Sequence, residues 1–575
     1  MKNHIKFAIA PAAALGVTLV TGCATATAAQ AIAAQTTTAQ GTASLTVRTD
    51  AGTVRGVAHG QAHQFLGVPY AAPPVGALRW KSPRPVKPWT GTRAATASGP
   101  ACVGPAYNLP AGTTVSEDCL TVNVTTPASA PARPRPVMVF VHGGDFVSGT
   151  GGAFDPAEMA ARGDVVVVTV NYRLGVFGFF GYPGLPGSGD FGLQDQQAAL
   201  RWVHRNARAF GGDAANVTLF GQSAGSAAVC AQLTSPAARG MFAKAILQSA
   251  SCGTLEPRLF PGAPAPDAHD VSPWAPLKTV TARGTTLASK LGCASHKDPV
   301  SCLRNASVDA LAGPATATDP TFPAFKSPAY GTPTLPADPH RAIEQGRFAH
   351  VPVVLGYTRD EGRFVTSSIV NPAIGKVTFT PDVYAELTDA AYGPRAAAVR
   401  RAYDPSAYAG DLLPGTPESD RTGIEGALAW AAIETDRATA CPMLADAAAL
   451  SRRVPTYVYE FADRTAPTWL PVPAHFPAGA PHLADLPYLF ATTRPALPGA
   501  DNGPARLTPT QQRLSAQMIG YWTSFAHDGA PRTAPTWPRY RATAPNVQRL
   551  TPGGTATAPT TAEAATHKCA TWPTH

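Results

Sequence analysis

TLFGQSAGSAAVC, from Thr218 to Cys230, places Ser223 between two glycines directly after a short β-branched and aromatic run. In a Gly-x-Ser-x-Gly turn a strand ends sharply and the serine projects into a cleft, while the glycines prevent collisions where the chain doubles back. The pattern is weak by itself, because a chain with 52 glycines can produce it as an ordinary small-residue loop. Here the strand pattern NVTLF precedes the turn and a small-residue helix pattern follows it. We therefore predict that Ser223 is a nucleophile.

Strand and helix patterns alternate around this turn. Two nearly continuous apolar runs, RPVMVFV and GDVVVVTV, are typical of strands buried on both faces of a sheet. Between them DPAEMAARG is helical in character, with Asp155 as a candidate N-cap before Pro156. A longer helix pattern, LQDQQAALRWVHRNARAFGG, ends at paired glycines, and later strand patterns are KAILQSAS, HVPVVLGYTRDEG and PTYVYEFADRT. The alternation predicts the α/β class, with a large, mostly parallel, doubly wound sheet flanked by helices.

The two ends of this pattern differ from its centre. LTVRTDAGTVRGV and QFLGVPYA alternate polar and apolar residues, so we expect antiparallel strands on the N-terminal side. TPTQQRLSAQMIGYWTSFAHDG is amphipathic and ends at a glycine, and it predicts a terminal helix.

The N-terminus has the form of a targeting segment. A basic start and an apolar run from Phe7 to Val20, too short to span a bilayer, predict a signal peptide over residues 1–28. Two processing interpretations stay open. VTGC, which ends at Cys23, resembles a bacterial lipoprotein cleavage box, in which Cys23 would be acylated, whereas Ala26 to Ala28 suits an ordinary signal peptidase.

The rest of the chain divides simply. Residues 29–44 are small and polar and predict a leader or tether, and residues 45–575 predict a single folded domain. No later segment offers about 18 uninterrupted apolar residues, so we expect no membrane span. The predicted location is secreted and extracellular, or lipid-anchored at the outer cell surface.

Charge and cysteine content narrow the function class. The formal charge of +9 comes from scattered Lys and Arg residues, so we expect no nucleic-acid partner. Apart from Cys23, an even number of cysteines in an exported chain favours disulfides, and nearest neighbours would pair Cys102 with Cys119 and Cys293 with Cys302. No Cys-x-x-Cys spacing is present, so we expect no metal site.

A second glycine motif lies one strand and helix upstream of the serine. HGG, from His142 to Gly144, follows the apolar strand pattern VMVFV. Alone it is an ordinary strand-ending turn. Ahead of a serine turn, the backbone N–H groups of Gly143 and Gly144, with that of Ala224, predict an oxyanion hole.

The remaining partners of a serine nucleophile should follow it in the order acid, then histidine. VPVVLGYTRDEG places Asp360 and Glu361 directly after a buried strand pattern, and spacing alone does not choose between them. His475 and His482 come later, and His482 is preferred because it lies just before the helix-like LADLPYLF.

Taken together, several segments resemble the type B carboxylesterase/lipase family of α/β-hydrolases, from about Gly52 to Tyr540. The segments that carry the resemblance are FLGVPYAAPPVGALRW, SEDCLTVNV, VFVHGGDFVSG, NYRLGVFGF, FGLQDQQAALRWVHRNARAFGGDAANVTLFGQSAGS, ILQS, RDEG and YWTSFAHDGAP. The resemblance implies an α/β-hydrolase fold for the catalytic domain, residues 45–575. It also implies an esterase that acts on a small-molecule ester without metal or organic cofactor.

The resemblance assigns roles to individual residues. It implies that Ser223 is the nucleophile, Glu361 the acid and His482 the base, because GAPHLADLPYLF looks like the family's histidine segment and His475 lacks that continuation. It also implies disulfides Cys102 to Cys119, Cys293 to Cys302 and Cys441 to Cys569, and leaves open whether Cys230 and Cys252 pair or remain thiols.

Three departures from the family pattern bear on substrate. Gln222 stands where the family usually has glutamate, and Leu483 stands where glycine is common. The segment from Cys102 to Cys119 contains no tryptophan, so acetylcholine is a poor candidate. We expect hydrolysis of short- or medium-chain or aryl esters. The alternatives are a lipase for longer-chain acylglycerols and a non-catalytic adhesion or binding protein on the same fold.

Overall fold

The computed structural model describes residues 43–105, 109–256, 272–313, 325–371, 377–468, 472–492, 505–541, 543–554 and 556–572. The chain divides into two units, Met1–Gln40 and Gly41–His575. The predicted signal peptide and nearly all of the predicted tether lie outside the described residues, as does most of the proline-rich segment before Trp274.

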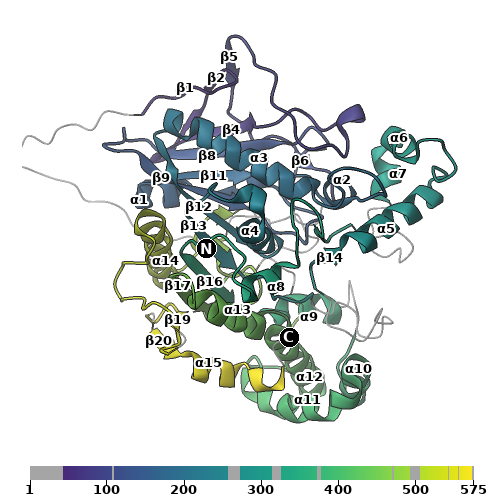
Figure 1. Cartoon of the computed structure of the whole chain (residues 1–575). Helices are drawn as coiled ribbons and strands as arrows, with labels where there is room; N and C mark the ends of the chain where they lie inside the picture. The colour runs from purple at the N-terminus through teal and green to yellow at the C-terminus, as the bar shows by residue number, and fades with distance from the viewer. Residues whose placement is uncertain are drawn as a thin grey trace, which may run out of the picture. The chain divides into compact units, whose positions relative to one another are not determined.

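An eleven-stranded sheet forms the centre of the described residues (Figure 1). Its strands, in spatial order, are β20 (Ala556–Pro559), β19 (Asn546–Leu550), β17 (Thr456–Phe461), β16 (Val353–Thr358), β13 (Lys244–Gln248), β12 (Gly212–Gln222), β9 (Arg135–Val141), β11 (Val166–Val170), β8 (Thr121–Pro127), β4 (Ala62–Pro69) and β3 (Val57–His59).

The strands from β11 through β9, β12, β13, β16 and β17 to β19 pair in parallel, whereas β3, β4, β8 and β20 pair antiparallel. Parallel neighbours need crossover connections, and helices provide them here. The expected mostly parallel sheet with antiparallel strands on its N-terminal side is confirmed. Because β12, β13 and β16 are adjacent and parallel, the loops after them meet at one edge of the sheet.

The sheet is buried on both faces. Along β9, Val137, Val139 and Val141 belong to one apolar core, and Met138 and Phe140 belong to another. Successive side chains of a strand point to opposite faces, so each core covers one face.

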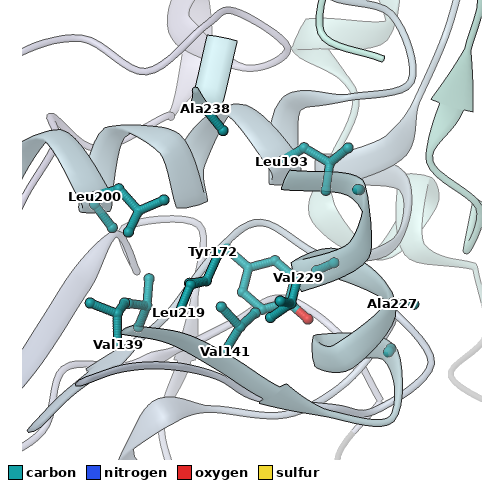
Figure 2. Close-up of a cluster of buried hydrophobic side chains, with 14 of the residues drawn as sticks. Val139, Val141, Tyr172, Leu193, Leu200, Leu219, Ala227, Val229 and Ala238 are labelled. Atoms are coloured by element: carbon teal, nitrogen blue, oxygen red, sulfur yellow. The ribbon is translucent and has the colours of Figure 1, made fainter. Parts of the chain in front are cut away.

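Helices complete both cores. On the first face α3 (Phe191–Asn206) contributes Leu193 and Leu200, and α4 (Ala224–Thr234) contributes Ala227 and Val229. Figure 2 shows these side chains packed over those of Val139, Val141 and Leu219. On the second face lie α1 (Ala157–Gly163) and α14 (Pro509–Asp528), which contact each other.

The other described elements lie around this sheet. The helices are α2 (Gly175–Phe179), α5 (Leu277–Lys290), α6 (Pro299–Asn305), α7 (Val308–Ala312), α8 (Pro339–Glu344), α9 (Gly362–Val370), α10 (Pro381–Tyr392), α11 (Ala396–Ala402), α12 (Glu418–Glu434), α13 (Cys441–Ser451) and α15 (Thr560–Thr566). The small strands are β1 (Thr46–Arg48), β2 (Thr53–Arg55), β5 (Thr92–Ala94), β6 (Ala101–Cys102), β7 (Val115–Ser116), β10 (Phe154–Asp155), β14 (Ala275–Pro276), β15 (Ala329–Tyr330) and β18 (Ala491–Thr492).

Two local predictions need correction. Pro156, not Asp155, occupies the N-cap of α1, and Asp155 belongs to β10, although its carboxylate still accepts the Ala157 N–H at 3.1 Å. The predicted terminal helix exists as α14 and stops at Gly529 in the left-handed region, but it is not terminal. Strands β19 and β20 follow it and form one edge of the sheet, and helix α15 comes after them.

Four disulfides join the described cysteines: Cys102–Cys119, Cys230–Cys252, Cys293–Cys302 and Cys441–Cys569. Three of these pairs confirm the sequence prediction. The fourth answers the open question about Cys230 and Cys252, which tie α4 to the segment after β13. In the described parts of the chain, no helix combines the length and apolar character needed to cross a bilayer.

Candidate active site

Ser223 occupies a strained turn between a strand and a helix. It follows the last residue of β12, caps the N-terminus of α4 and has φ 57° and ψ −129°. A positive φ in a residue with a side chain costs of order 1–3 kcal/mol and persists only where the surroundings enforce it. Here β12 and β13 enforce it, since the Ser223 N–H donates to the Gln248 carbonyl at 2.9 Å.

The two glycines of the motif are required by close packing. A Cβ added at Gly225 would lie 2.0 Å from the Val141 carbonyl oxygen, and one at Gly221 would lie 2.5 Å from the Gly225 backbone. Such distances leave no room for any side chain. The turn therefore depends on both glycines, as the sequence pattern predicts.

The His-Gly-Gly loop lies beside this serine. A Cβ built on Gly143 would be 2.9 Å from the Ser223 Cβ. Among the residues that the structure describes, the backbone N–H groups of Gly143, Gly144 and Ala224 have no acceptor. Ala224 also begins a helix, where free N–H groups and the helix dipole favour negative charge. The loop and the helix start can therefore stabilise an anionic oxygen near Ser223.

The carbonyl groups of the same loop are held on the other side. Tyr172 Oη donates to the His142 carbonyl at 2.9 Å, and His142 Nδ1 donates to the Gly143 carbonyl at 2.8 Å. In a trans peptide the C=O and the following N–H point in opposite directions. Holding these carbonyls therefore turns the Gly143 N–H away from Tyr172 Oη and the Gly144 N–H away from His142 Nδ1.

His142 is buried and stacks on Tyr172 with ring centroids 4.6 Å apart. Burial lowers the pKa of His142 to about 4, so its imidazole is neutral and can fix the loop without adding positive charge.

Glu361 and His482 are hydrogen-bonded to each other at the same edge of the sheet. Glu361 lies three residues after β16, and its carboxylate contacts His482 Nδ1. The other carboxylate oxygen of Glu361 accepts the Thr358 N–H at 2.8 Å, which fixes the side chain. The structure thus brings Glu361, and not Asp360, to His482.

The second ring nitrogen of His482 points toward the end of β12. His482 Nε2 lies 3.2 Å from Gln222 Nε2, and Gln222 directly precedes Ser223. The His482 ring also packs edge-on against Phe364 with centroids 5.5 Å apart. His475, the alternative histidine, makes no such contact with any described residue of the site.

A buried polar network that the sequence reasoning missed supports this region. Asp485, three residues after His482, accepts hydrogen bonds from Gln248 Nε2 at 2.8 Å and Tyr459 Oη at 3.2 Å. Burial raises the pKa of Asp485 to about 6. The acidic residue within HLADLPYLF was the available signal, but its partners lie on β13 and β17, which only the fold brings near.

One other group of acidic and histidine side chains, Glu460, Glu563 and His567, could hold a metal ion by distance. Arg549 already bonds both glutamates, at 2.8 and 2.6 Å. The two ring nitrogens of His567 bond Asp436 at 2.8 Å and Glu460 at 3.0 Å. Among the described residues, every carboxylate oxygen and ring nitrogen of the group except Glu563 Oε2 is thus hydrogen-bonded, and the cluster is an ion network that includes α15.

The sheet order, the serine turn and the His482–Glu361 pair define the chain as an α/β-hydrolase. The family model of the carboxylesterase family matches residues 43–572, and the chain belongs to that family. It is a carboxylic ester hydrolase.

Individual relatives agree with this assignment. The para-nitrobenzyl esterase of Bacillus subtilis is 34% identical over 86% of this chain and 92% of its own length. The acetylcholinesterase of Bungarus fasciatus is 32% identical over 90% of this chain and 84% of its own length. A solved structure of a thermophilic PNB esterase superposes with a TM-score of 0.71 at 30% identity, covering 91% of this chain and 99% of that one.

Proposed function

We propose that the chain is an exported serine esterase that cleaves short- or medium-chain or aryl carboxylic esters through an acyl-enzyme on Ser223. The observation that carries the proposal is the His482–Glu361 pair at the sheet edge where Ser223 follows β12 in a strained turn. Gly143, Gly144 and Ala224 supply N–H groups at the same place that no described residue accepts.

Each side chain then has one role. His482 Nε2 takes the proton from the Ser223 hydroxyl as the oxygen attacks the ester carbonyl, and the oxyanion accepts the three backbone N–H groups. His482 then gives the proton to the leaving alcohol. In the second half-reaction His482 takes a proton from water, the water oxygen attacks the acyl-enzyme, and the carboxylic acid is released as Ser223 regains its proton. Glu361 keeps the proton on Nδ1 and stabilises the imidazolium that forms.

The wall of the site supports small substrates. A hollow beside His482 is lined by Phe364, Pro467, Thr468, Pro481, His482, Leu483 and Ala484. Leu483 stands where glycine is common in the family, so its side chain occupies part of this wall. A wall filled in this way suits a short acyl chain or a ring better than the long chain of a lipase substrate.

Export is the second part of the proposal. It rests on the basic and apolar N-terminus and on the four disulfides, which persist in oxidising compartments. The N-terminal segment would be processed either by cleavage after Ala28 or by acylation at Cys23. Residues 45–575 would then form a single catalytic domain of the mature enzyme.

A fluorophosphonate probe tests the nucleophile. We expect covalent labelling of the folded protein and none of Ser223→Ala. Equal labelling of both proteins would show that the assignment is wrong.

A nitrophenyl ester series tests the substrate class. We expect the highest kcat/KM for short or medium acyl chains, and a maximum at about twelve carbons or longer would favour the lipase alternative instead.

A further inference from the structure

Asp360, the neighbour of Glu361, binds the loop that carries His482. The Asp360 N–H donates to the Ala480 carbonyl at 2.9 Å, and the Ala480 N–H donates to Asp360 Oδ2 at 2.9 Å. Asp360, which directly precedes Glu361, therefore both donates to and accepts from Ala480. Ala480 lies two positions before His482.

Two arginines also bind the Asp360 carboxylate. Arg464, just after β17, donates to it through Nε at 3.0 Å and Nη2 at 2.8 Å, and Arg363 Nε lies 3.3 Å from Oδ1. Arg363 Nη1 also donates to the Pro477 carbonyl at 3.1 Å. The His482 loop is thus bonded at two backbone positions.

A second carboxylate balances the charge of this cluster. Asp411 accepts from Arg464 Nη1 at 2.7 Å and also bonds Arg363 Nη2. Burial alone would raise the pKa of Asp411, but the charges and hydrogen bonds of Arg363 and Arg464 outweigh it and hold the pKa below its ordinary value. Two arginines and two aspartates leave the cluster neutral overall, which favours ordered ion pairs at low exposure.

The loop approaches Asp360 so closely that no side chain fits between them. Gly479 has φ +63°, and a Cβ added there would lie 2.5 Å from Asp360 Oδ2. The side chains of Asp360 and Arg363 are 6% and 5% exposed, so little water competes for these bonds.

We infer that Asp360 is a positioning residue that fixes the backbone of residues 477–480, and through it the imidazole of His482 between Glu361 and the end of β12. The inference rests on the proposed role of His482 as the base. Two adjacent residues then have two roles at the site. Glu361 orients the His482 ring, and Asp360 holds the loop that carries it. A displacement of about 1 Å in a catalytic group commonly costs about 100-fold in rate.

Two variants separate positioning from general stability. Asp360→Asn removes a charge, and it also removes the hydrogen-bond acceptor of either the Ala480 N–H or an arginine. Asp411→Asn removes a charge from the same cluster but leaves the hydrogen bonds of the His482 loop in place. We expect kcat of Asp360→Asn to fall about 10- to 100-fold with KM changed less than about twofold, and kcat of Asp411→Asn to fall less than about threefold.

The pH profile gives an independent readout. The charged groups that face His482 are Glu361 at Nδ1 and Asp485 in the following turn, while Gln222 at Nε2 is neutral. If the loop loosens, His482 loses contact with Glu361, and the acid limb of kcat/KM moves to lower pH. We expect this shift in Asp360→Asn and not in Asp411→Asn.

Gly479→Ala adds a third route, because its methyl group would push the loop from Asp360 without removing a charge. Thermal unfolding checks that all variants fold. Equal losses of kcat in the two asparagine variants, or a wild-type kcat and pH profile in Asp360→Asn, would overturn the inference. An active Ser223→Ala enzyme would instead overturn the proposed function and leave the loop contacts unexplained.

Discussion

Gln222 Nε2 lies 3.2 Å from His482 Nε2, so the nitrogen that would accept the Ser223 proton has an amide beside it. With the Nδ1 proton directed at Glu361, Nε2 is the acceptor and the amide donates. A glutamate at this position could not donate to a neutral imidazole when ionised. The amide therefore stabilises the neutral base, whereas a carboxylate would stabilise its protonated form.

Replacing Gln222 by glutamate should raise the pKa of His482. Two unit charges about 4 Å apart interact by about 4 kcal/mol at an effective dielectric of 20, and water near the partly exposed ring reduces this. Because a higher pKa leaves less neutral imidazole at a given pH, the acid limb of the kcat/KM profile should move to higher pH by about one unit or more.

Gln222→Met is the matched control for this measurement. It removes the amide without adding charge, so only the loss of the amide hydrogen bond remains, and the acid limb should move to higher pH by much less than in Gln222→Glu. A Gln222→Glu profile that overlays the wild type would mean that residue 222 does not sense the charge of His482.

The two candidate histidines should differ sharply when replaced. We expect His482→Ala to lower kcat by about 10³-fold or more, since no other group described near Ser223 can take its proton. His475→Ala should keep activity within about threefold, because its side chain contacts none of the site residues. Steady-state hydrolysis of nitrophenyl acetate measures both variants, and the reverse ranking would show that the wrong histidine had been chosen.

Gly144 should be sensitive because of its backbone conformation. Its φ is +111°, which a residue with a side chain rarely adopts, so Gly144→Ala should rotate the peptide that presents an oxyanion donor. Loss of one donor costs about 10²- to 10³-fold in kcat.

Gly60→Ala is a matched control in the turn between β3 and β4, with φ +58° and open space around the added Cβ. It also places a side chain at positive φ, at a smaller backbone cost, and should leave kcat unchanged. Equal effects on kcat in the two variants would argue against a role for Gly144 in the reaction.

His567 should make stability depend on pH. Burial alone would lower its pKa, but Asp436 and Glu460 outweigh burial and raise the pKa to about 10, from 6.5. The folded state therefore binds this proton more tightly than the unfolded state. Its stabilisation is complete below pH of about 6.5 and is lost as pH rises toward about 10.

Thermal unfolding of the wild type and His567→Gln across this interval tests the point. The Tm of the wild type should fall more steeply with rising pH than that of the variant. Other titrating groups are common to both proteins, so the difference isolates His567. Parallel Tm curves would contradict the assignment.

Sequence reasoning reached the parts of the site that depend on local rules. The turn at Ser223 needs glycines at fixed offsets, and the order serine, acid, histidine follows from the order of parallel strands. Strand β8 was not predicted because its sequence, TVNVTTP, includes polar residues that lie in the interior. Asn123 is satisfied there by donating to Thr169 Oγ1 at 3.1 Å and accepting the Gly67 N–H at 2.9 Å.

The contacts of Gln222, Asp360 and Asp485 could not be predicted because their partners are distant in sequence. Gln222 and His482 are 260 residues apart, and Asp485 and Gln248 are 237 apart. No periodicity links such residues, and only the pairing of strands brings them together.

The late position of His482 also sets when activity can arise. A nascent chain that has emerged as far as α9 already contains Ser223 and Glu361 but lacks His482, the base of the proposed mechanism. The loop around Ala480 must then dock on Asp360 before His482 has a defined place. In the proposed mechanism, synthesis and folding of this esterase thus pass through a long interval in which the Ser223 hydroxyl lacks its base and cannot react with the esters of the cell that makes it.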